Sequence, residues 1–348
     1  MSKVNYFICV MFMLMICIWL NGQPVTWDWA VRAGGISYDY CEAMCTDNED
    51  NIYVTGSLCD NSSFGSIELT IDDGEMYVAK FNNGNWIWVQ QFTADQCNAI
   101  ATDSNLNTYI TGSFVGSAAF GSNYLYESGV HSNVFVAKLD LNGNWVWAIS
   151  VGDIWEDSGR CIAIGSNGDV YVAGKFKLTA TFGNISLNCS SAESDIFIAK
   201  LDSSGNWLWA KKIGGPNNET CNSIAVDSND NIYLTGNFNG TATFGSNSIS
   251  SSENSSDIYV AKISNIGDWI WARQAGWANN EYSGGLAVDN DDNIIIGGYY
   301  FGDTYIGSNW LTMAGNEDIF VAKLDNTGNW LWAKQSGGGE LKDVIMSI

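Results

Sequence analysis

The pair Trp-x-Trp recurs six times along the chain and sets the strongest constraint on its fold. The pairs begin at Trp27, Trp86, Trp145, Trp207, Trp269 and Trp330. A second landmark, Asn-Ile-Tyr-Val-Thr-Gly or a close variant, keeps the same period. Its third position is held by Tyr53, Tyr109, Tyr171, Tyr233 and Ile295. Landmarks at nearly fixed spacing in five successive units indicate a repeat array.

Each unit reads as short strands joined by turn residues, without helical periodicity. In the second unit the strands are predicted at 99–102, 108–112, 120–126, 134–139 and 145–150. In Trp145-Val146-Trp147-Ala148 a period of two predicts both Trp side chains on one face and Val146 and Ala148 on the other. Sheets with two apolar faces are typical of stacked blades. We therefore predict an all-β fold, a β-propeller with four-stranded blades of ~60 residues. A flat solenoid is the alternative array.

The two ends of the chain carry different signals. Lys3, an uncharged apolar run at 4–20 and the small residue Gly22 predict a signal peptide at 1–22, leaving a β-propeller repeat domain at 23–348. Residues 27–31 resemble a lone last strand and Asp343–Ile348 a first strand. We therefore expect five complete blades plus partial terminal blades, with truncation at the C-terminus. A five-bladed ring with frayed ends is the alternative.

Composition excludes several classes of function. The chain has 38 acidic and 15 basic residues, a net charge of −23 and a pI of about 4.1. Nucleic acid and anionic membrane surfaces are therefore not expected partners, because both require clustered Lys and Arg. No membrane insertion is expected after removal of the signal. His131 is the one histidine, and no Gly-x-Ser-x-Gly elbow is present, so catalysis finds weak support.

The segments around the fourth unit point to a known repeat. Ser223-Ile224-Ala225-Val226-Asp227, Asn231 to Gly236, Asp257 to Lys262 and Gly267-Asp268-Trp269 resemble the bacterial β-propeller repeat called SBBP, and the resemblance covers nearly all of the chain after residue 22. It implies a propeller fold and an exported or surface-located protein, often with several domains. It brings no catalytic residues.

Acidic turns recur between the first two strands of the units. Alternate oxygen-bearing side chains in them resemble the first half of a calcium loop, and the candidate metal ligands are Asp47, Glu49, Asp227, Asn229, Asp289 and Asp291. The Gly and Glu of the second half of such a loop are missing. Tight turns closed by Asp and Asn hydrogen bonds are the competing interpretation. Calcium is the only cofactor that the sequence suggests.

Aromatic residues outside the repeated pairs are the candidate ligand contacts. The Trp-x-Trp side chains are expected in the core. We interpret Trp155, Trp277, Tyr38, Tyr40 and Tyr282 as loop aromatics on one rim of the ring, where propellers carry variable binding loops.

The sequence thus favours an exported, non-catalytic binding or scaffold module, secreted or at the cell surface, that engages a protein or glycan through rim loops. A secreted hydrolase or lyase acting on carbohydrate is the first alternative, with a carboxylate pair visible only in three dimensions. A structural cell-surface repeat array is the second.

Overall fold

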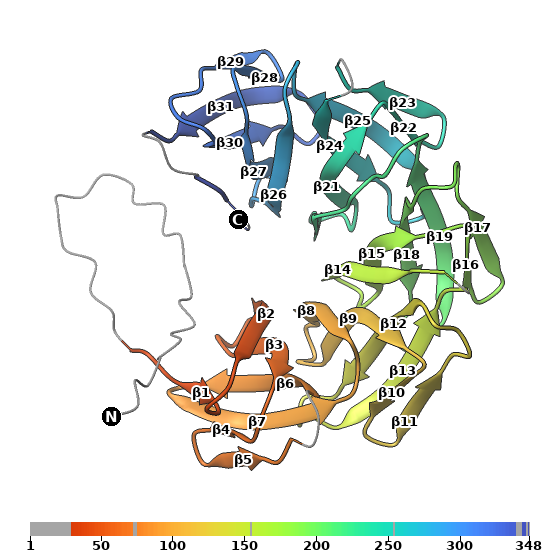
Figure 1. The fold of residues 1–348 in the computed structure, drawn as a ribbon, viewed down its shortest axis with the longest axis vertical. Coiled ribbons are helices and arrows are strands. Elements are labelled where there is room, and N and C mark those ends of the chain that lie inside the picture. Colours follow the sequence, from red (N-terminus) through yellow and green to blue (C-terminus); the bar gives the residue numbers. More distant parts are fainter. Residues whose placement is uncertain are drawn as a thin grey trace.

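The protein is an open arc of antiparallel β-sheets in the computed structural model (Figure 1). The structure describes residues 29–71, 75–153, 155–252, 255–338, 343–345 and 347, so the predicted signal peptide at 1–22 and Trp27 lie outside the described residues. No helix occurs in the described part of the chain. The all-β prediction is confirmed.

Five four-stranded units, here called blades 1 to 5, follow one another around a central axis. Blade 1 holds β2 (Asp39–Thr46), β3 (Ile52–Leu58), β6 (Glu75–Asn82) and β7 (Asn85–Phe92). Blade 2 holds β8 (Gln96–Thr102), β9 (Thr108–Val115), β12 (Ser132–Leu139) and β13 (Trp145–Val151). Blade 3 holds β14 (Ser158–Ile164), β15 (Val170–Phe176), β18 (Asp195–Leu201) and β19 (Trp207–Gly214). Blade 4 holds β20 (Ser223–Val226), β21 (Ile232–Asn239), β24 (Ser256–Ile263) and β25 (Trp269–Ala275). Blade 5 holds β26 (Glu281–Val288), β27 (Ile294–Tyr300), β30 (Asp318–Leu324) and β31 (Trp330–Ser336).

A short hairpin interrupts every blade between its second and third strands. The hairpins are β4 (Ser62–Phe64) with β5 (Ile67–Leu69), β10 (Ser117–Phe120) with β11 (Asn123–Tyr126), β16 (Thr179–Phe182) with β17 (Ile185–Asn188), β22 (Thr241–Phe244) with β23 (Asn247–Ser250), and β28 (Thr304–Ile306) with β29 (Asn309–Leu311). They lie on the periphery of the arc (Figure 1). In blade 4 the hairpin also pairs with the outermost strand of blade 3, because Ile213 of β19 is opposite Phe244 of β22. This hairpin therefore ties two neighbouring blades together.

The ends of the arc differ from the predicted strands. β1 (Ala33–Gly34) pairs with β4, the position that the last strand of a preceding blade would take. The strand thus lies after the predicted 27–31 segment. Residues 343–345 and 347 form no strand, in contrast to the prediction for Asp343–Ile348. Among the described residues no strand pairing joins blade 1 to blade 5.

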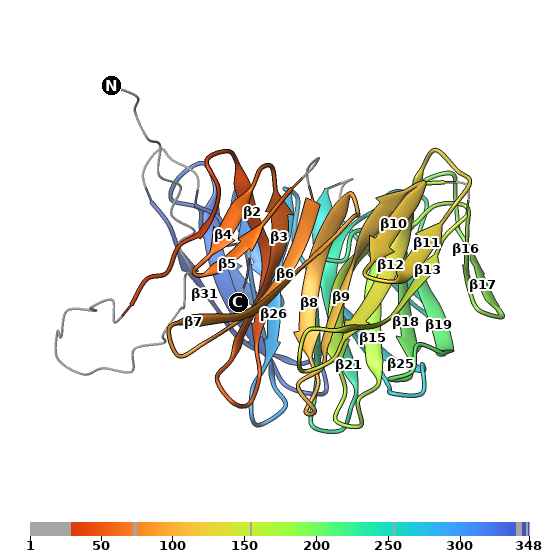
Figure 2. The ribbon, with the colours of Figure 1, turned by 90° about the horizontal axis from the view of Figure 1, so that it is seen from below.

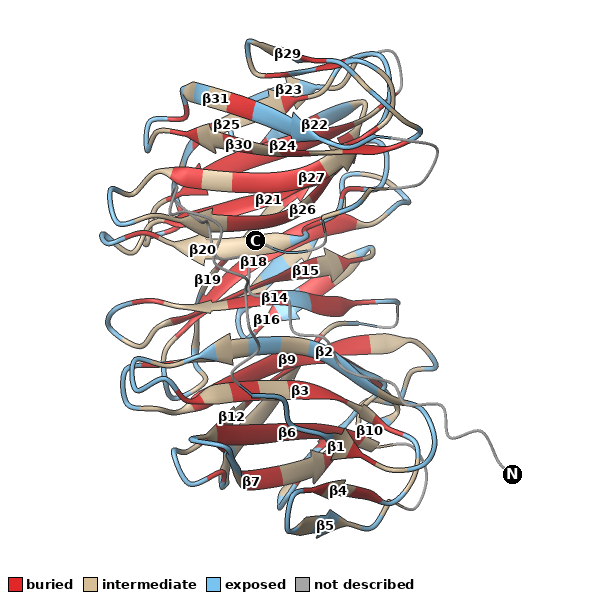
Figure 3. Cartoon of the chain, turned by 90° about the vertical axis from the view of Figure 1, so that its left-hand side faces the viewer, coloured by how far each residue is buried: buried red, intermediate tan, exposed pale blue. Residues whose placement is uncertain are grey.

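The core lies between adjacent blades, not at the axis. The second and third strands are the most deeply buried, as the colouring of Figure 3 shows for β9, β21 and β27. Clusters of buried apolar side chains join blade 1 to 2, 2 to 3, 3 to 4 and 4 to 5. Burying both faces of each sheet explains why a unit has no polar face of its own.

The prediction that both Trp of a pair share one sheet face is wrong. Trp145 is opposite Leu139 and Trp147 is opposite Lys138, so Val146 is an extra, bulged residue. Leu139 and Lys138 point to opposite faces, and the two Trp side chains therefore do so as well. Trp145 packs into the cluster between blades 1 and 2, and Trp147 into the next one. The pair still belongs to the core, with one ring on each face.

The two edges of the arc present different connections, because consecutive antiparallel strands run in opposite directions between them (Figure 2). One edge, the turn face, carries the short turns after the first and third strands. The other, the hairpin face, carries the loops between blades and the connections that lead into the hairpins. Any ligand thus meets one of two chemically distinct faces, or the axis between them.

Candidate functional site

A β-bulge in each innermost strand sets the lining of the axis. The register shifts across residues 42, 98, 160 and 284, where one residue has no direct partner on the second strand. Asn222 holds the equivalent position of blade 4, one repeat after Arg160. The five equivalent residues are Glu42, Asn98, Arg160, Asn222 and Gly284. Such bulges commonly re-aim a side chain.

The bulges explain why the landmark segment that contains the repeated Tyr ends with a Gly. That Gly stands opposite the bulge, and the backbone oxygen there leaves no room for a side chain. A Cβ on Gly112 would lie 1.9 Å from the Gln96 oxygen, and one on Gly236 would lie 1.8 Å from the Thr220 oxygen. The same holds for Gly56, Gly174 and Gly298. Sequence reasoning noted this Gly only as a landmark.

Two of the bulged residues connect neighbouring blades. The amide of Asn98 donates to the Gly159 carbonyl of blade 3 at 2.7 Å. Asn222 makes the equivalent bond to the Ser283 carbonyl of blade 5, also at 2.7 Å. Arg160 stands where a third such Asn would be, and its guanidinium has no hydrogen bond or ion pair within the described structure.

A cavity of about 470 Å³ opens at the axis between blades 2 and 5. Its polar and aromatic lining includes Asn98, Arg160, Lys175, Glu219, Asn222 and Tyr282. Burial, with a smaller contribution from Asp195, raises the pKa of Glu219 to about 8, so this carboxyl is mostly neutral at pH 7. Lys175 forms a long ion pair with the exposed Glu156 carboxylate, at 3.9 Å, and also lies near the Asp157 carboxyl. Arg160 and Lys175 are thus the two cationic side chains of the lining, in a strongly acidic molecule.

A second candidate surface lies on the hairpin of blade 5. Tyr305 of β28 and Trp310 of β29 are cross-strand neighbours with ring centroids 4.6 Å apart. Trp277, in the loop before β26, lies 5.5 Å from the Tyr305 ring. The three side chains are 50% (Trp277), 38% (Tyr305) and 46% (Trp310) exposed. We call these three residues the aromatic cluster. Only Trp277 was identified from the sequence.

The remaining predicted aromatics are scattered. Trp155, in the loop between β13 and β14, stacks on His131 with ring centroids 5.4 Å apart. Tyr38 is an exposed loop residue near the start of the arc. The prediction that Tyr40 and Tyr282 lie in loops is wrong, because they belong to the innermost strands β2 and β26. Tyr282 stacks on Tyr299 at the axial cavity instead.

The six predicted metal ligands lie on the turn face, two in each of three separate turns. Asp47 accepts hydrogen bonds from the backbone N–H groups of Glu49 and Asn51, the Asn51 amide and the Tyr53 hydroxyl, at 2.7–3.0 Å. Asn229 and Asp291 donate in the same way to Asp227 and Asp289. These carboxylates are thus engaged in closing their own turns.

No group of three metal-binding side chains occurs among the residues that the structure describes. Calcium binding stays a prediction. Three Lys residues that recur once per repeat, Lys200, Lys262 and Lys323, form ion pairs with Asp169, Asp227 and Asp289 at 2.7, 3.1 and 2.7 Å.

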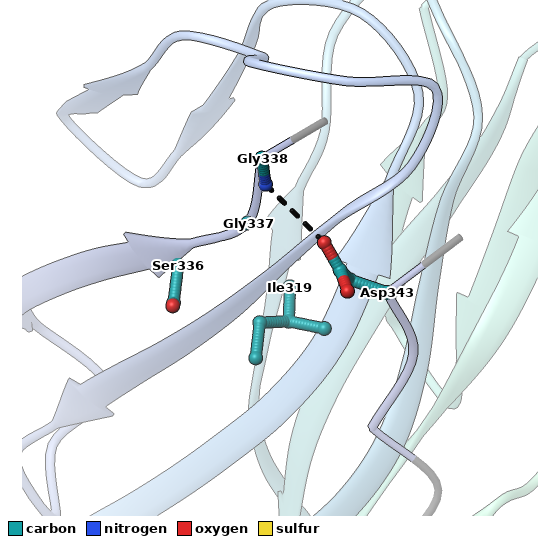
Figure 4. Close-up of a pocket in the computed structure, with 5 residues that line it drawn as sticks. All are labelled: Ile319, Ser336, Gly337, Gly338 and Asp343. Carbon is teal, nitrogen blue, oxygen red and sulfur yellow. Dashed lines mark hydrogen bonds between the residues drawn. The ribbon is translucent and has the colours of Figure 1, made fainter. Parts of the chain in front are cut away.

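A row of buried acids that sequence reasoning missed lies at the seams between blades. Asp157, Glu219 and Glu281 recur once per repeat and precede or begin an innermost strand. Burial raises their pKa values to about 7, 8 and 8. Asp343 continues the spacing, and Figure 4 shows it beside blade 5, accepting a bond from the Gly338 N–H at 3.3 Å. A cavity of about 360 Å³ adjoins it. The regular spacing of these acids was the available signal.

Comparison with known proteins identifies the repeat. Two segments, 87–113 and 208–241, match the family model of the SBBP β-propeller repeat. Both segments match the pattern of the SBBP β-propeller repeat. The first matched SBBP segment runs from β7 of blade 1 to β9 of blade 2, and the second from β19 of blade 3 to β22 of blade 4. The resemblance stated from the sequence is confirmed.

Two curated proteins are similar to this chain. An uncharacterized WD repeat-containing protein of Acanthamoeba polyphaga mimivirus is 26% identical, over 92% of this chain and 29% of its own length. The regulatory protein FlaEY of Caulobacter vibrioides is 27% identical, over 47% of this chain and 18% of its own. The chain spans less than a third of either relative.

Two solved structures are also similar to this chain. A protein of unknown function from Bacteroides caccae has a TM-score of 0.39 at 9% identity, covering 86% of this chain and 82% of that one. A thermostable family-43 glycoside hydrolase has a TM-score of 0.39 at 11% identity, covering 89% and 96%. Within the described residues no helix has the length and apolar character needed to span a membrane.

Proposed function

We propose that this propeller is a non-catalytic binding module that holds a glycan on its hairpin face. The aromatic cluster, Trp277, Tyr305 and Trp310, carries this proposal. Exposed aromatic rings offer flat apolar faces against which the C–H faces of sugar rings pack, while sugar hydroxyl groups stay hydrated.

The repeat supplies an internal comparison for the cluster. In blades 1 to 4 the positions of Tyr305 and Trp310 hold Ser63 and Glu68, Ala119 and Tyr124, Thr181 and Ser186, and Thr243 and Ser248. The scaffold therefore folds without a large aromatic pair at these positions. Two neighbouring aromatics in blade 5 alone are best explained by contact with a ligand, because exposed rings add little to the packing of the blade.

The cluster is also held in place by its surroundings. The Gly276 N–H donates to the Tyr305 carbonyl at 2.9 Å, and the Ser255 hydroxyl donates to the Trp277 carbonyl at 2.9 Å. These bonds fix the loop against the hairpin before any ligand arrives. A surface organised in advance loses less conformational entropy on binding.

The proposal is tested by affinity electrophoresis in native gels that contain xylan, a β-glucan or a mannan. We expect retardation of the wild-type protein by at least one polysaccharide, and its loss in Trp277→Ala and Trp310→Ala. Tyr126→Ala is the matched control, since Tyr126 is an exposed aromatic on the hairpin of blade 2. Retardation that survives both Trp substitutions, or its absence in every gel, contradicts a glycan site and favours a protein partner.

We propose in addition that the protein is exported, to the medium or the cell surface. The charged start and apolar run of residues 1–22 support this. Expression of the full chain in a bacterial host, followed by fractionation and N-terminal sequencing, tests it. A mature protein that begins near Gln23 outside the cytoplasm is expected, and full-length cytoplasmic protein contradicts export.

A further inference from the structure

Arg160 is a bulged residue whose chemistry differs from that of the Asn at the same position of both neighbouring blades. Asn98 and Asn222, at the same position of blades 2 and 4, each donate to a backbone carbonyl of the next blade. Arg160 makes no such bond in the described structure, and the seam between blades 3 and 4 holds without it. A guanidinium has five donors and no acceptor, and its planar fork matches a carboxylate.

The surroundings of Arg160 favour an anion over a cation. Lys175 lines the same cavity, and the one carboxyl in the lining that is deeply buried, Glu219, has its pKa raised to about 8 by burial. At neutral pH the lining therefore carries the two positive charges of Arg160 and Lys175 and little negative charge of its own, although Lys175 is also paired with Glu156 at 3.9 Å. Because the whole molecule has a net charge of −23, an anion is held here by local contacts and not by the overall field.

An aromatic wall completes the cavity. Tyr282 of β26 and Tyr299 of β27 are cross-strand partners whose rings stack at 5.1 Å and 24°. Phe301 supports both from the side, with centroid distances of 6.0 and 6.1 Å. The ring of Tyr282 is thus held in one orientation. The volume of about 470 Å³ lies within the range of small-molecule sites.

We propose that the axial cavity binds a small carboxylate with a ring-shaped body, the size class of a uronic acid, in which Arg160 grips the carboxylate and Tyr282 packs against the ring. This site goes beyond the proposed function, because it lies at the axis and shares no residue with the aromatic cluster. Lys175 supplies the second charge and Asn98 and Asn222 frame the opening.

Isothermal titration calorimetry with matched ligands tests the proposal. D-Galacturonate and D-galactose differ at C6 alone, as a carboxylate and a hydroxymethyl group, and benzoate and benzyl alcohol form a second pair. We expect the carboxylate of at least one pair to bind ~10-fold or more tightly than its neutral partner. Neutral and charged members that bind alike, or no binding by either carboxylate, overturn the proposal.

Variants separate the site from other causes. Arg160→Gln is expected to abolish the preference for the carboxylate, and Arg160→Lys to retain part of it, because the charge stays while the fork is lost. Lys334→Gln, which removes an exposed charge from the outermost strand β31, and Trp277→Ala are the controls and keep wild-type affinity. Wild-type affinity in Arg160→Gln, with its melting temperature unchanged, overturns the proposal. Inorganic phosphate binding as tightly as either carboxylate also overturns it, since phosphate has no ring for Tyr282.

Discussion

At the scale of single residues, most of the repeated landmarks solve problems of local geometry. The Gly after the landmark Tyr makes room for a bulge, and the Asp of each acidic turn closes that turn. Asp227 illustrates this best: burial alone would raise its pKa, but bonds from Asn231 and Lys262 lower it, so the carboxylate stays charged. Arg160, Tyr305 and Trp310 have no such role in the local geometry of their blades, and these are the residues that we connect with ligands.

The bulge Gly gives the first prediction. Gly236→Ala places a Cβ 1.8 Å from the backbone oxygen of Thr220, which cannot rotate away, so we expect a loss of about 3 kcal/mol in the free energy of unfolding. Urea denaturation measures it. Gly129→Ala is the control, because a Cβ there meets nothing closer than 3.8 Å. A Gly236→Ala protein as stable as the control would show that the bulge relaxes.

The acidic turns give the second prediction. Asp227→Asn removes the charge that pairs with the nearly buried Lys262, 3.1 Å away, and we expect it to lower the free energy of unfolding by about 2 kcal/mol. Thermal unfolding in calcium and in EDTA separates the two interpretations of these turns. Equal melting temperatures of the wild-type protein support simple turns. A rise in calcium that Asp227→Asn lacks would establish calcium binding.

At the scale of elements, the outermost strand of each of blades 2 to 4 connects three blades. Its bulge turns the first Trp of the pair toward the preceding blade and the second toward the following one, where the Trp147 Nε1–H donates to the Ser203 carbonyl at 3.2 Å. The residue between the two rings packs into neither core, and Val146 is accordingly about half exposed. The sequence pattern Trp-x-Trp therefore places one ring in the core on each side of the strand.

This gives the third prediction. Trp147→Ala removes a ring from the core between blades 2 and 3 and should lower the free energy of unfolding by about 3–5 kcal/mol. Val146→Ala, one residue away on the same strand, should change it by less than about 0.5 kcal/mol. Guanidinium denaturation followed by tryptophan fluorescence compares the two. Similar losses for both variants would restore the simple alternation in which Val146 is also a core residue.

At the scale of the whole molecule, the acids with shifted pKa values include two groups with opposite dependence on pH. Asp157, Glu219 and Glu281 at the seams have pKa values raised by burial to about 7, 8 and 8. Asp289, paired with Lys323, has its pKa lowered to about 2. In the unfolded chain all four titrate near 4.

The fourth prediction follows from the sign of these shifts. Between about pH 4 and pH 8 the native seam acids keep protons that the unfolded chain has lost, so stability falls as the pH rises through this window. Below about pH 4 the turn carboxylates lose their pairing and stability falls again. We expect the highest melting temperature near pH 4–5, and a loss of up to about 4 kcal/mol for each seam acid by pH 8.

Scanning calorimetry from pH 3 to pH 9 measures this profile. The double variant Glu219→Gln and Glu281→Gln should flatten its upper part, because neither side chain then titrates. Glu49→Gln, in an exposed turn, is the control and should keep the wild-type slope. A melting temperature that rises from pH 5 to pH 8 would contradict the assignment of the seam acids.

The sequence by itself determined the repeat, its period, the all-β class and most strand positions. These features depend on turn residues and on a periodicity that recur in every unit. Strands predicted at 134–139 and 145–150 are observed at Ser132–Leu139 and Trp145–Val151. The burial of the Trp pairs followed from the same patterns. Because each local signal recurs in five units, every strand assignment is supported by its equivalents in the other units.

Only the tertiary structure decided which faces the rings occupy and which residues meet. A bulge changes the face of every side chain beyond it, and a single strand sequence does not reveal an extra residue, so Trp145 and Trp147 were placed together. Arg160 and Tyr282 come from blades 3 and 5, and Trp277 and Trp310 from a loop and a hairpin on either side of β26 and β27. Such pairs depend on how the blades are stacked around the axis, which no local pattern in the sequence records.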